Sequence, residues 1–116
     1  MPKFMLLLHD DPTAFAGVGP EQMQKVVEKY IAWGTRLREA GLMHAGEKLT
    51  DEPGKVLRSK DGQVRVTDGP YSETKEVLGG YYIIEAASYE QAIARSRDCP
   101  HLEYGGTMEV RQVDMM

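Results

Sequence analysis

The stretch KFMLLL at residues 3–8 decides the fold that this sequence predicts. Neighbouring residues of a β-strand point to opposite faces of a sheet. Here both alternating sets are apolar, with Phe4, Leu6 and Leu8 on one face and Met5 and Leu7 on the other. The stretch YYIIEA at residues 81–86 is similar, apart from Glu85. Strands with this pattern are buried on both faces, so we expect both to lie at the centre of a sheet.

Two helices and a hairpin surround these strands in the sequence. The first helix is predicted over residues 20–40, where Pro20 suits the first helical position and apolar residues recur at helical spacing. The second is predicted over residues 88–99, with Ser88 and Gln91 forming a capping box. Asp61-Gly62 lies between two short β-like runs, which is a strong local signal for a hairpin over residues 56–67.

Further strands are predicted over residues 42–49 and 107–113. The order of elements is therefore β-α-β, hairpin, β-α-β over residues 1–116, within a single domain. This order is typical of an α+β ferredoxin-like sandwich with an inserted hairpin. Two helices cover only one face of such a sheet, yet its central strands are apolar on both. We therefore expect a homodimer in which sheet packs on sheet, because an exposed apolar sheet would aggregate.

Composition places the chain among ordinary globular proteins. It has 116 residues, 41% of them hydrophobic and 28% charged, with a net charge of −4. The basic residues are scattered among acids, which argues against nucleic-acid binding. The single cysteine excludes an internal disulfide, and no apolar run is long enough to cross a membrane or serve as a signal peptide. We expect a soluble, cytoplasmic protein without a membrane partner.

The stretch VTDGPYSETKEVLGGYYIIE at residues 66–85 resembles the signature of DGPF-domain proteins, a branch of the YCII-related family. Tyr71 stands where the named motif has phenylalanine. KFMLLL at 3–8, GEKL at 46–49 and CPHLEYGGTMEVRQV at 99–113 resemble the family's other landmarks. The resemblance implies a dimeric α+β barrel in a superfamily that includes lactone isomerases and dehydrochlorinases. It also implies an Asp–His active-site pair. Genes for sigma factors beside many such proteins suggest a regulatory connection.

Asp68 and His101 are the candidate catalytic residues. Asp68 suits a turn before Gly69-Pro70, where its side chain can bind backbone N–H groups. It could also act as a general acid or base. His101 follows the second predicted helix, where it could be a solvent-facing loop or capping residue, the proton-transfer partner of Asp68, or a residue with a packing role.

Four further residues are candidates for ligand binding: Arg111, Glu85, Tyr81 and Lys75. Arg111 could hold an anionic group, or it could form a structural ion pair with Glu109 or Glu85. Tyr81 could stack on a flat ligand, and Lys75 either faces solvent or closes over an anion. His9, Asp10 and Asp11 could start a metal site, but no second spaced histidine pair accompanies them, and no metal or cofactor is expected.

Two functions remain open on the sequence alone. The first is a cofactor-free enzyme or binder in which Asp68 and His101 transfer protons on a small, anionic, cyclic compound. Isomerisation, elimination and hydrolysis all fit that description. The second is a non-catalytic dimeric module that binds a small signal or a regulatory protein, with Asp68 purely structural.

Overall fold

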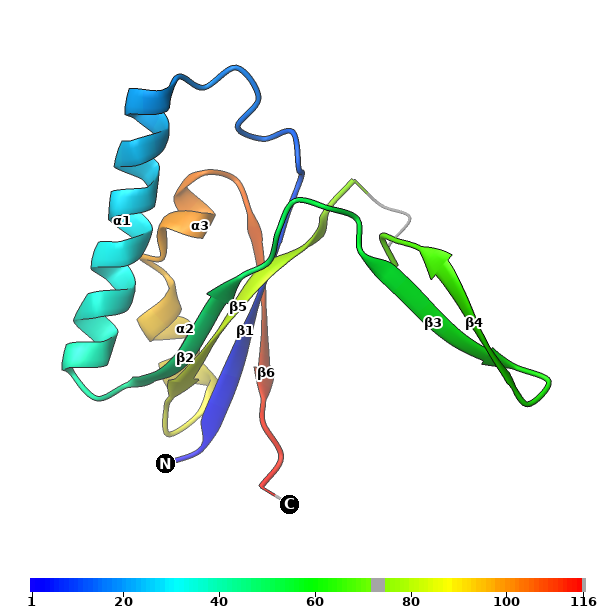
Figure 1. Cartoon of the computed structure of the whole chain (residues 1–116). Helices are drawn as coiled ribbons and strands as arrows, with labels where there is room; N and C mark the ends of the chain where they lie inside the picture. The colour runs from blue at the N-terminus through cyan, green and yellow to red at the C-terminus, as the bar shows by residue number, and fades with distance from the viewer. Residues whose placement is uncertain (72–74, 116) are drawn as a thin grey trace.

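A computed structural model describes residues 1–71 and 75–115 of the chain. The elements are β1 (Lys3–Asp10), α1 (Pro20–Glu39), β2 (Met43–Lys48), β3 (Lys55–Lys60), β4 (Gln63–Asp68), β5 (Val77–Glu85), α2 (Tyr89–Ser96), α3 (Pro100–Glu103) and β6 (Thr107–Gln112). Four strands form an antiparallel sheet in the order β2-β5-β1-β6 (Figure 1). This α+β arrangement is consistent with a ferredoxin-like fold.

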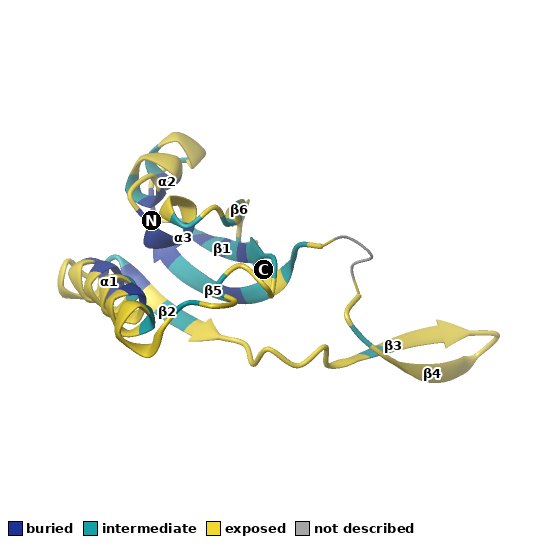
Figure 2. Ribbon diagram, turned by 90° about the horizontal axis from the view of Figure 1, so that it is seen from above, coloured by how far each residue is buried: buried dark blue, intermediate teal, exposed yellow. Residues whose placement is uncertain are grey.

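The core lies between the sheet and the helices. Phe4, Leu6 and Leu8 of β1 alternate with less buried residues and point toward the helices. From α1, Trp33 and Leu37 pack on them, as the apolar spacing along that helix predicts. Figure 2 shows the buried residues gathered between the helices and the sheet. The full core cluster is Phe4, Leu6, Leu8, Trp33, Leu37, Met43, Ile84, Ala86, Ala92 and Cys99.

The opposite face of the sheet is apolar at its centre. The helices lie on one side of the sheet in both Figure 1 and Figure 2. Strand register places Leu7 beside Tyr81 and Met5 beside Ile83, and Ala45 beside Ile83. These side chains point away from the helices because they alternate with the core residues. We call this surface the open face; its centre consists of Met5, Leu7, Ala45, Tyr81 and Ile83.

β3 and β4 form a separate two-stranded sheet, here called the arm (residues 55–68). Asp61 and Gly62 both have positive φ at its tip, as a tight two-residue hairpin turn requires. The arm extends from the body on the side of the open face (Figures 1 and 2). The radius of gyration is consequently 16.1 Å, against about 13 Å for a compact chain of this length.

Two boundaries differ from the sequence-based expectation. The second helix ends at Ser96 rather than Cys99, and Pro100 begins α3 instead of ending a helix. Proline is suited to that first position because it needs no N–H partner there. β5 begins at Val77, so Gly79 and Gly80 lie inside a strand that was expected to follow them. Gly79 fits there because a Cβ would approach Asp10 Oδ1 to 3.0 Å.

Candidate functional site

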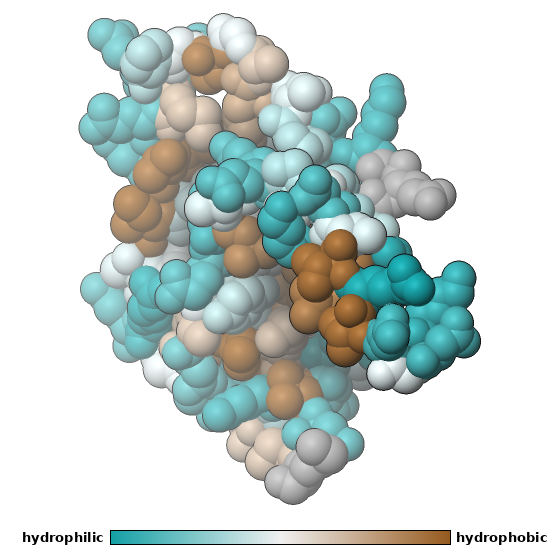
Figure 3. Space-filling view, turned by 45° about the vertical axis from the view of Figure 1, so that its right-hand side comes forward, coloured by the Kyte–Doolittle hydropathy of each residue, from teal (hydrophilic) through white to brown (hydrophobic). Residues whose placement is uncertain are grey.

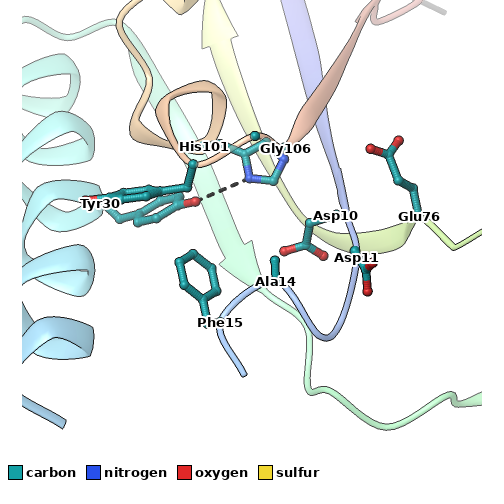
Figure 4. Close-up of a pocket in the computed structure, with 10 residues that line it drawn as sticks. Asp10, Asp11, Ala14, Phe15, Tyr30, Glu76, His101 and Gly106 are labelled. Carbon is teal, nitrogen blue, oxygen red and sulfur yellow. Dashed lines mark hydrogen bonds between the residues drawn. The ribbon is translucent and has the colours of Figure 1, made fainter. Parts of the chain in front are cut away.

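A small cavity of about 60 Å³ opens where β1 ends, next to α3. Figure 4 shows that its polar groups come from opposite sides: Tyr30 from α1, His101 from α3, and Asp10 from the end of β1. Segments far apart in the sequence thus converge here. The lining residues are Asp10, Asp11, Ala14, Phe15, Tyr30, Glu76, His101, Tyr104, Gly105 and Gly106.

His101 is held rigidly at the back of this cavity. It is only 4% exposed, and its Nε2 lies 2.9 Å from the carbonyl oxygen of His9 and 3.1 Å from that of Thr107. A carbonyl oxygen can only accept a hydrogen bond, so Nε2 carries the proton and donates to both. The ring therefore ties the end of β1 to the start of β6.

Because Gly106 has no side chain, the His101 ring can occupy the space next to it. A Cβ at this position would lie 2.3 Å from His101 Nε2 and 2.4 Å from Cε1, far inside van der Waals contact. The Gly106 N–H also donates to the His101 carbonyl oxygen at 2.9 Å. Only glycine allows the backbone to approach the imidazole this closely.

Tyr30 completes the hydrogen bonding of the imidazole. Its hydroxyl lies 3.3 Å from His101 Nδ1. With the proton on Nε2, Nδ1 is an acceptor, and the phenol O–H donates to it. Burial raises the pKa of Tyr30 well above its ordinary value, so the phenol stays protonated. Both ring nitrogens of His101 are consequently engaged within the fold.

Asp10 is the carboxylate of the cavity with the clearest change in proton affinity. Desolvation by burial raises its pKa from the ordinary value of 3.8, although electrostatic interactions with His101 and Lys48 act in the opposite direction. A desolvated carboxylate holds a proton more strongly than an exposed one, as a general base requires. Asp10 is therefore the group in this cavity best suited to accept a proton from a ligand.

The outer wall of the cavity combines an ordered turn with aromatic rings. Asp11 Oδ1 accepts hydrogen bonds from Thr13 N at 2.9 Å and from Thr13 Oγ1 at 2.8 Å. The backbone bond from Thr13 is the main reason that the pKa of Asp11 is lowered, in contrast to its neighbour Asp10. Phe15 and Tyr104 meet edge to face with ring centroids 5.7 Å apart. The wall is thus fixed by contacts between loop residues and α3.

The cavity opens into a much larger groove of about 1610 Å³. The two share Asp10, Phe15, Tyr30 and His101 among their lining residues. The groove adds an apolar wall from α1 that consists of Met23, Val26, Val27 and Ile31. A ligand can therefore place one polar edge in the cavity while its apolar part lies along α1.

The structure does not bring Asp68 and His101 together within the chain. Asp68 ends β4, its side chain is 80% exposed, and it forms an ion pair with Lys55 of β3. Both ribbon views show the arm well apart from α3 (Figures 1 and 2). His101 is buried in α3, so of the positions considered from the sequence the solvent-facing loop is wrong and a packing role fits.

Three of the predicted ligand-binding residues lie on the open-face side of the sheet, away from the cavity. Arg111 is paired with Glu109 at 3.5 Å, which corresponds to the structural ion pair considered from the sequence. Glu85 lies 3.1 Å from His44, at the rim of the open face. Tyr81 belongs to the open face itself, beside Leu7 of β1.

Lys75 lies nearer the cavity than the other three. It is exposed, and its positive charge contributes to the lowered pKa of Asp11. The part of the signature at residues 72–74 lies outside the described residues. Lys75 is therefore close enough to influence Asp11, but it is not among the residues that line the cavity.

The cavity contains two functional candidates that the sequence reasoning missed, Asp10 and Tyr30. The sequence suggests Asp10 only as part of a metal site, and Tyr30 only as a member of the apolar face of a helix. Within residues 1–71 and 75–115, no group of three or more His, Cys, Asp or Glu is placed to hold a metal ion. The same described residues include no helix that is long and apolar enough to span a bilayer.

Comparison with known proteins gives a match over nearly the whole chain. The family model of the YCII-related domain matches residues 2–116. An uncharacterized protein of Rhizobium meliloti (strain 1021) is 30% identical over 110 residues, which cover 93% of this chain and 89% of that protein.

Among solved structures, the fold is similar to that of 5-chloro-2-hydroxyhydroquinone dehydrochlorinase from Burkholderia phenoliruptrix AC1100, in complex with 2,5-dihydroxybenzoquinone. The TM-score is 0.50 at 15% identity, and the match covers 97% of this chain and 93% of that one. At this identity the likeness shows a common fold and nothing further about chemistry.

Proposed function

The chain belongs to the YCII-related family, and from this premise we propose that it is a small enzyme that removes a proton from a hydroxylated ring compound. The observation that carries the proposal is the desolvated carboxylate of Asp10 in a cavity backed by Tyr30 and His101. A positioned general base typically contributes a factor of about 10² to 10⁴ to the rate. Asp10 replaces Asp68 as the proposed base.

The Tyr30–His101 pair orients the substrate. The Tyr30 proton points to His101 Nδ1, which leaves lone pairs of the phenol oxygen free to accept a hydrogen bond from a substrate hydroxyl. His101 has both nitrogens occupied in this arrangement, so it acts as a positioning residue for Tyr30. This division of roles favours a substrate that carries at least one O–H group.

The charge of the cavity favours an uncharged substrate over the anionic one expected from the sequence. Asp10, Asp11 and Glu76 line it, and no Lys or Arg is among the lining residues in the described part of the chain. Arg111, the residue expected to hold an anion, is on the other side of the sheet. A neutral phenol can approach these carboxylates without the repulsion that an anion would meet.

The test uses 5-chloro-2-hydroxyhydroquinone, the compound in the name of the structural neighbour. Binding is measured by calorimetry and turnover by chloride release. We expect the wild-type protein to bind this compound and release chloride from it, and Asp10→Asn to lose turnover by about 100-fold. Asp68→Asn is the matched control and should retain both properties. Equal losses in the two variants, or loss only in Asp68→Asn, would contradict the proposal.

We also propose that the protein works as a homodimer formed through the open face. The apolar centre of that face, which includes Met5 and Ile83, has no helix over it in the described residues (Figure 1). Sedimentation at micromolar concentration should give a dimer. Ile83→Lys places a charge at the centre of the face and should give monomers. Ile31→Lys, the same change at an exposed position of α1, should leave the dimer intact.

A second candidate function follows from the engagement of His101. Because both ring nitrogens are bonded within the fold, the histidine is also compatible with a purely structural role. The protein would then be a dimeric module that binds a small signal in the groove without converting it. Tight binding of a ring compound with no turnover in wild type or variants would favour this alternative.

A further inference from the structure

The arm has one apolar face and one basic face. In its antiparallel register Leu57 is paired with Val66 and Ser59 with Val64, so these residues share a face. The residues between them lie on the other face, where Arg58 is paired with Arg65. The arm is thus amphipathic in the way that a strand pair covering a core would be.

The apolar face of the arm has no core of its own to cover. Leu57, Val64 and Val66 are 64%, 66% and 60% exposed. β3 and β4 pack chiefly on each other, and Figure 3 shows hydrophobic side chains on the surface at this projecting part of the molecule. A lone two-stranded hairpin is marginally stable in water. A partner that covered its apolar face would therefore stabilise it.

The charge of the arm differs in sign from that of the body. Residues 55–68 contain four Lys or Arg and two Asp, a net charge of +2. The whole chain carries −4, so the remainder carries −6. An arm of one copy is therefore complementary in charge to the body of another copy, which favours association between copies of this chain.

The position of the arm also allows such a contact. The arm extends from the body on the side of the open face in both ribbon views (Figures 1 and 2). We propose that the arm clasps a second copy of this chain, with its apolar face packed on the body of the copy that docks on the open face. This inference rests on the homodimer proposed above.

A single symmetric partner accounts for both unpartnered surfaces. Three apolar side chains are too few for an interface, since stable ones bury about 800 Å² on each partner. They suffice as an extension of a larger contact through the open face. A two-fold axis repeats the arm contact, so each copy clasps the other.

The proposal is tested with two lysine substitutions on neighbouring residues of β4. Val66→Lys charges the apolar face, whereas Thr67→Lys adds the same charge to the opposite face of the same strand. Both positions are exposed in the single chain, so neither variant should unfold it. We expect Val66→Lys to raise the dimer dissociation constant at least about tenfold, and Thr67→Lys to change it less than about threefold. Equal effects of the two variants would overturn the proposal.

A cross-linking experiment identifies what the arm touches. Cys99 is 1% exposed, so a cysteine introduced by Ser59→Cys on the apolar face can carry a photoreactive label selectively. Equal amounts of ¹⁵N-labelled and unlabelled chains are mixed and irradiated. Cross-linked peptides of mixed isotope composition support the clasp, and cross-links confined to one chain overturn it. Arg58→Cys, on the opposite face, is the control and should give few mixed products.

The failure of the arm contact can be distinguished from the failure of the dimer. A monomeric wild-type protein overturns both proposals. A dimer that Ile83→Lys disrupts and Val66→Lys does not affect leaves the open-face interface standing and overturns the clasp. None of these outcomes depends on the chemistry proposed for Asp10.

Discussion

Asp10 and Asp68 have similar local sequence contexts but very different structural surroundings. Each ends an antiparallel strand, and each is followed two residues later by a proline, Pro12 or Pro70. Asp10 lies in a cavity with His101, and burial raises its pKa. Asp68 lies on the arm, mostly exposed and paired with Lys55.

The difference shows that a strand-end aspartate acquires reactivity from what covers it. The motif around Asp68 is long and distinctive, yet nothing in the described residues shields its carboxylate from water. Asp10 has a short local signal, but α1, α3 and β5 all approach it. Desolvation of a carboxylate needs such packing by distant segments. The pKa is therefore raised at Asp10, where this packing is present.

The largest expected effect on stability comes from Gly106→Ala, which disrupts the packing around His101. The added methyl would overlap the buried ring, and displacing the ring breaks its bonds to His9 and Thr107. We expect a loss of about 3 kcal/mol in the free energy of unfolding. Gly19→Ala is the control, since nothing lies within 4 Å of a Cβ there. Urea unfolding with equal midpoints for both variants would show that the ring is not held as described.

The next largest effect is the difference in stability between two tyrosine-to-phenylalanine variants, one in the cavity and one near the arm. Tyr30→Phe removes the donor to His101 Nδ1 and leaves a buried acceptor unsatisfied, which should cost about 1–3 kcal/mol of stability. It should also weaken binding of a hydroxylated ring. Tyr71→Phe, three residues beyond the arm, keeps its ring over Arg58 and should change stability by less than about 0.5 kcal/mol. Thermal unfolding of the pair measures the contrast directly, and an equal shift in both would break it.

A smaller effect is the pH dependence of stability due to Asp10. Its folded-state pKa is raised, so the folded protein binds this proton more tightly than the unfolded chain. The contribution to stability is present at low pH and is lost as the pH rises from 3.8 through the raised pKa. Asp10→Asn should therefore gain stability relative to wild type over that range, by less than about 1 kcal/mol because solvent screens the group.

Asp11 supplies a control of opposite sign for this pH dependence. Its pKa is lowered by the bonds from Thr13, so its contribution is present above 3.8 and is lost as the pH falls through the lowered pKa. Unfolding curves of Asp11→Asn should therefore diverge from wild type in the direction opposite to those of Asp10→Asn. Parallel behaviour of the two variants would mean that burial does not distinguish the two neighbours.

The fold was more predictable from the sequence than the site. The pattern in residues 3–8 and 81–86 identified the two central strands, because a strand buried on both faces has apolar residues at successive positions. Helical spacing likewise located α1. The YCII-related family was also identified correctly from its landmarks. These features depend on local patterns that one chain displays.

The site depends on contacts between distant residues, which local patterns do not record. Tyr30 and His101 are 71 residues apart and meet only through the packing of α1 against α3. Gly106 looked like part of a glycine pair before a strand, and its role became visible only with the His101 ring against it. Pro100 pointed to a helix end, whereas it begins the short helix that carries the histidine.

The most direct test of this account is the carboxyl titration of Asp10, followed by ¹³C NMR in the wild-type protein. We predict a titration midpoint above 3.8, because burial in the cavity disfavours the charged form. We also expect the midpoint to move when a ring compound occupies the cavity. A midpoint at or below 3.8, unchanged by any bound ring compound, would show a solvated carboxylate and contradict the proposed site.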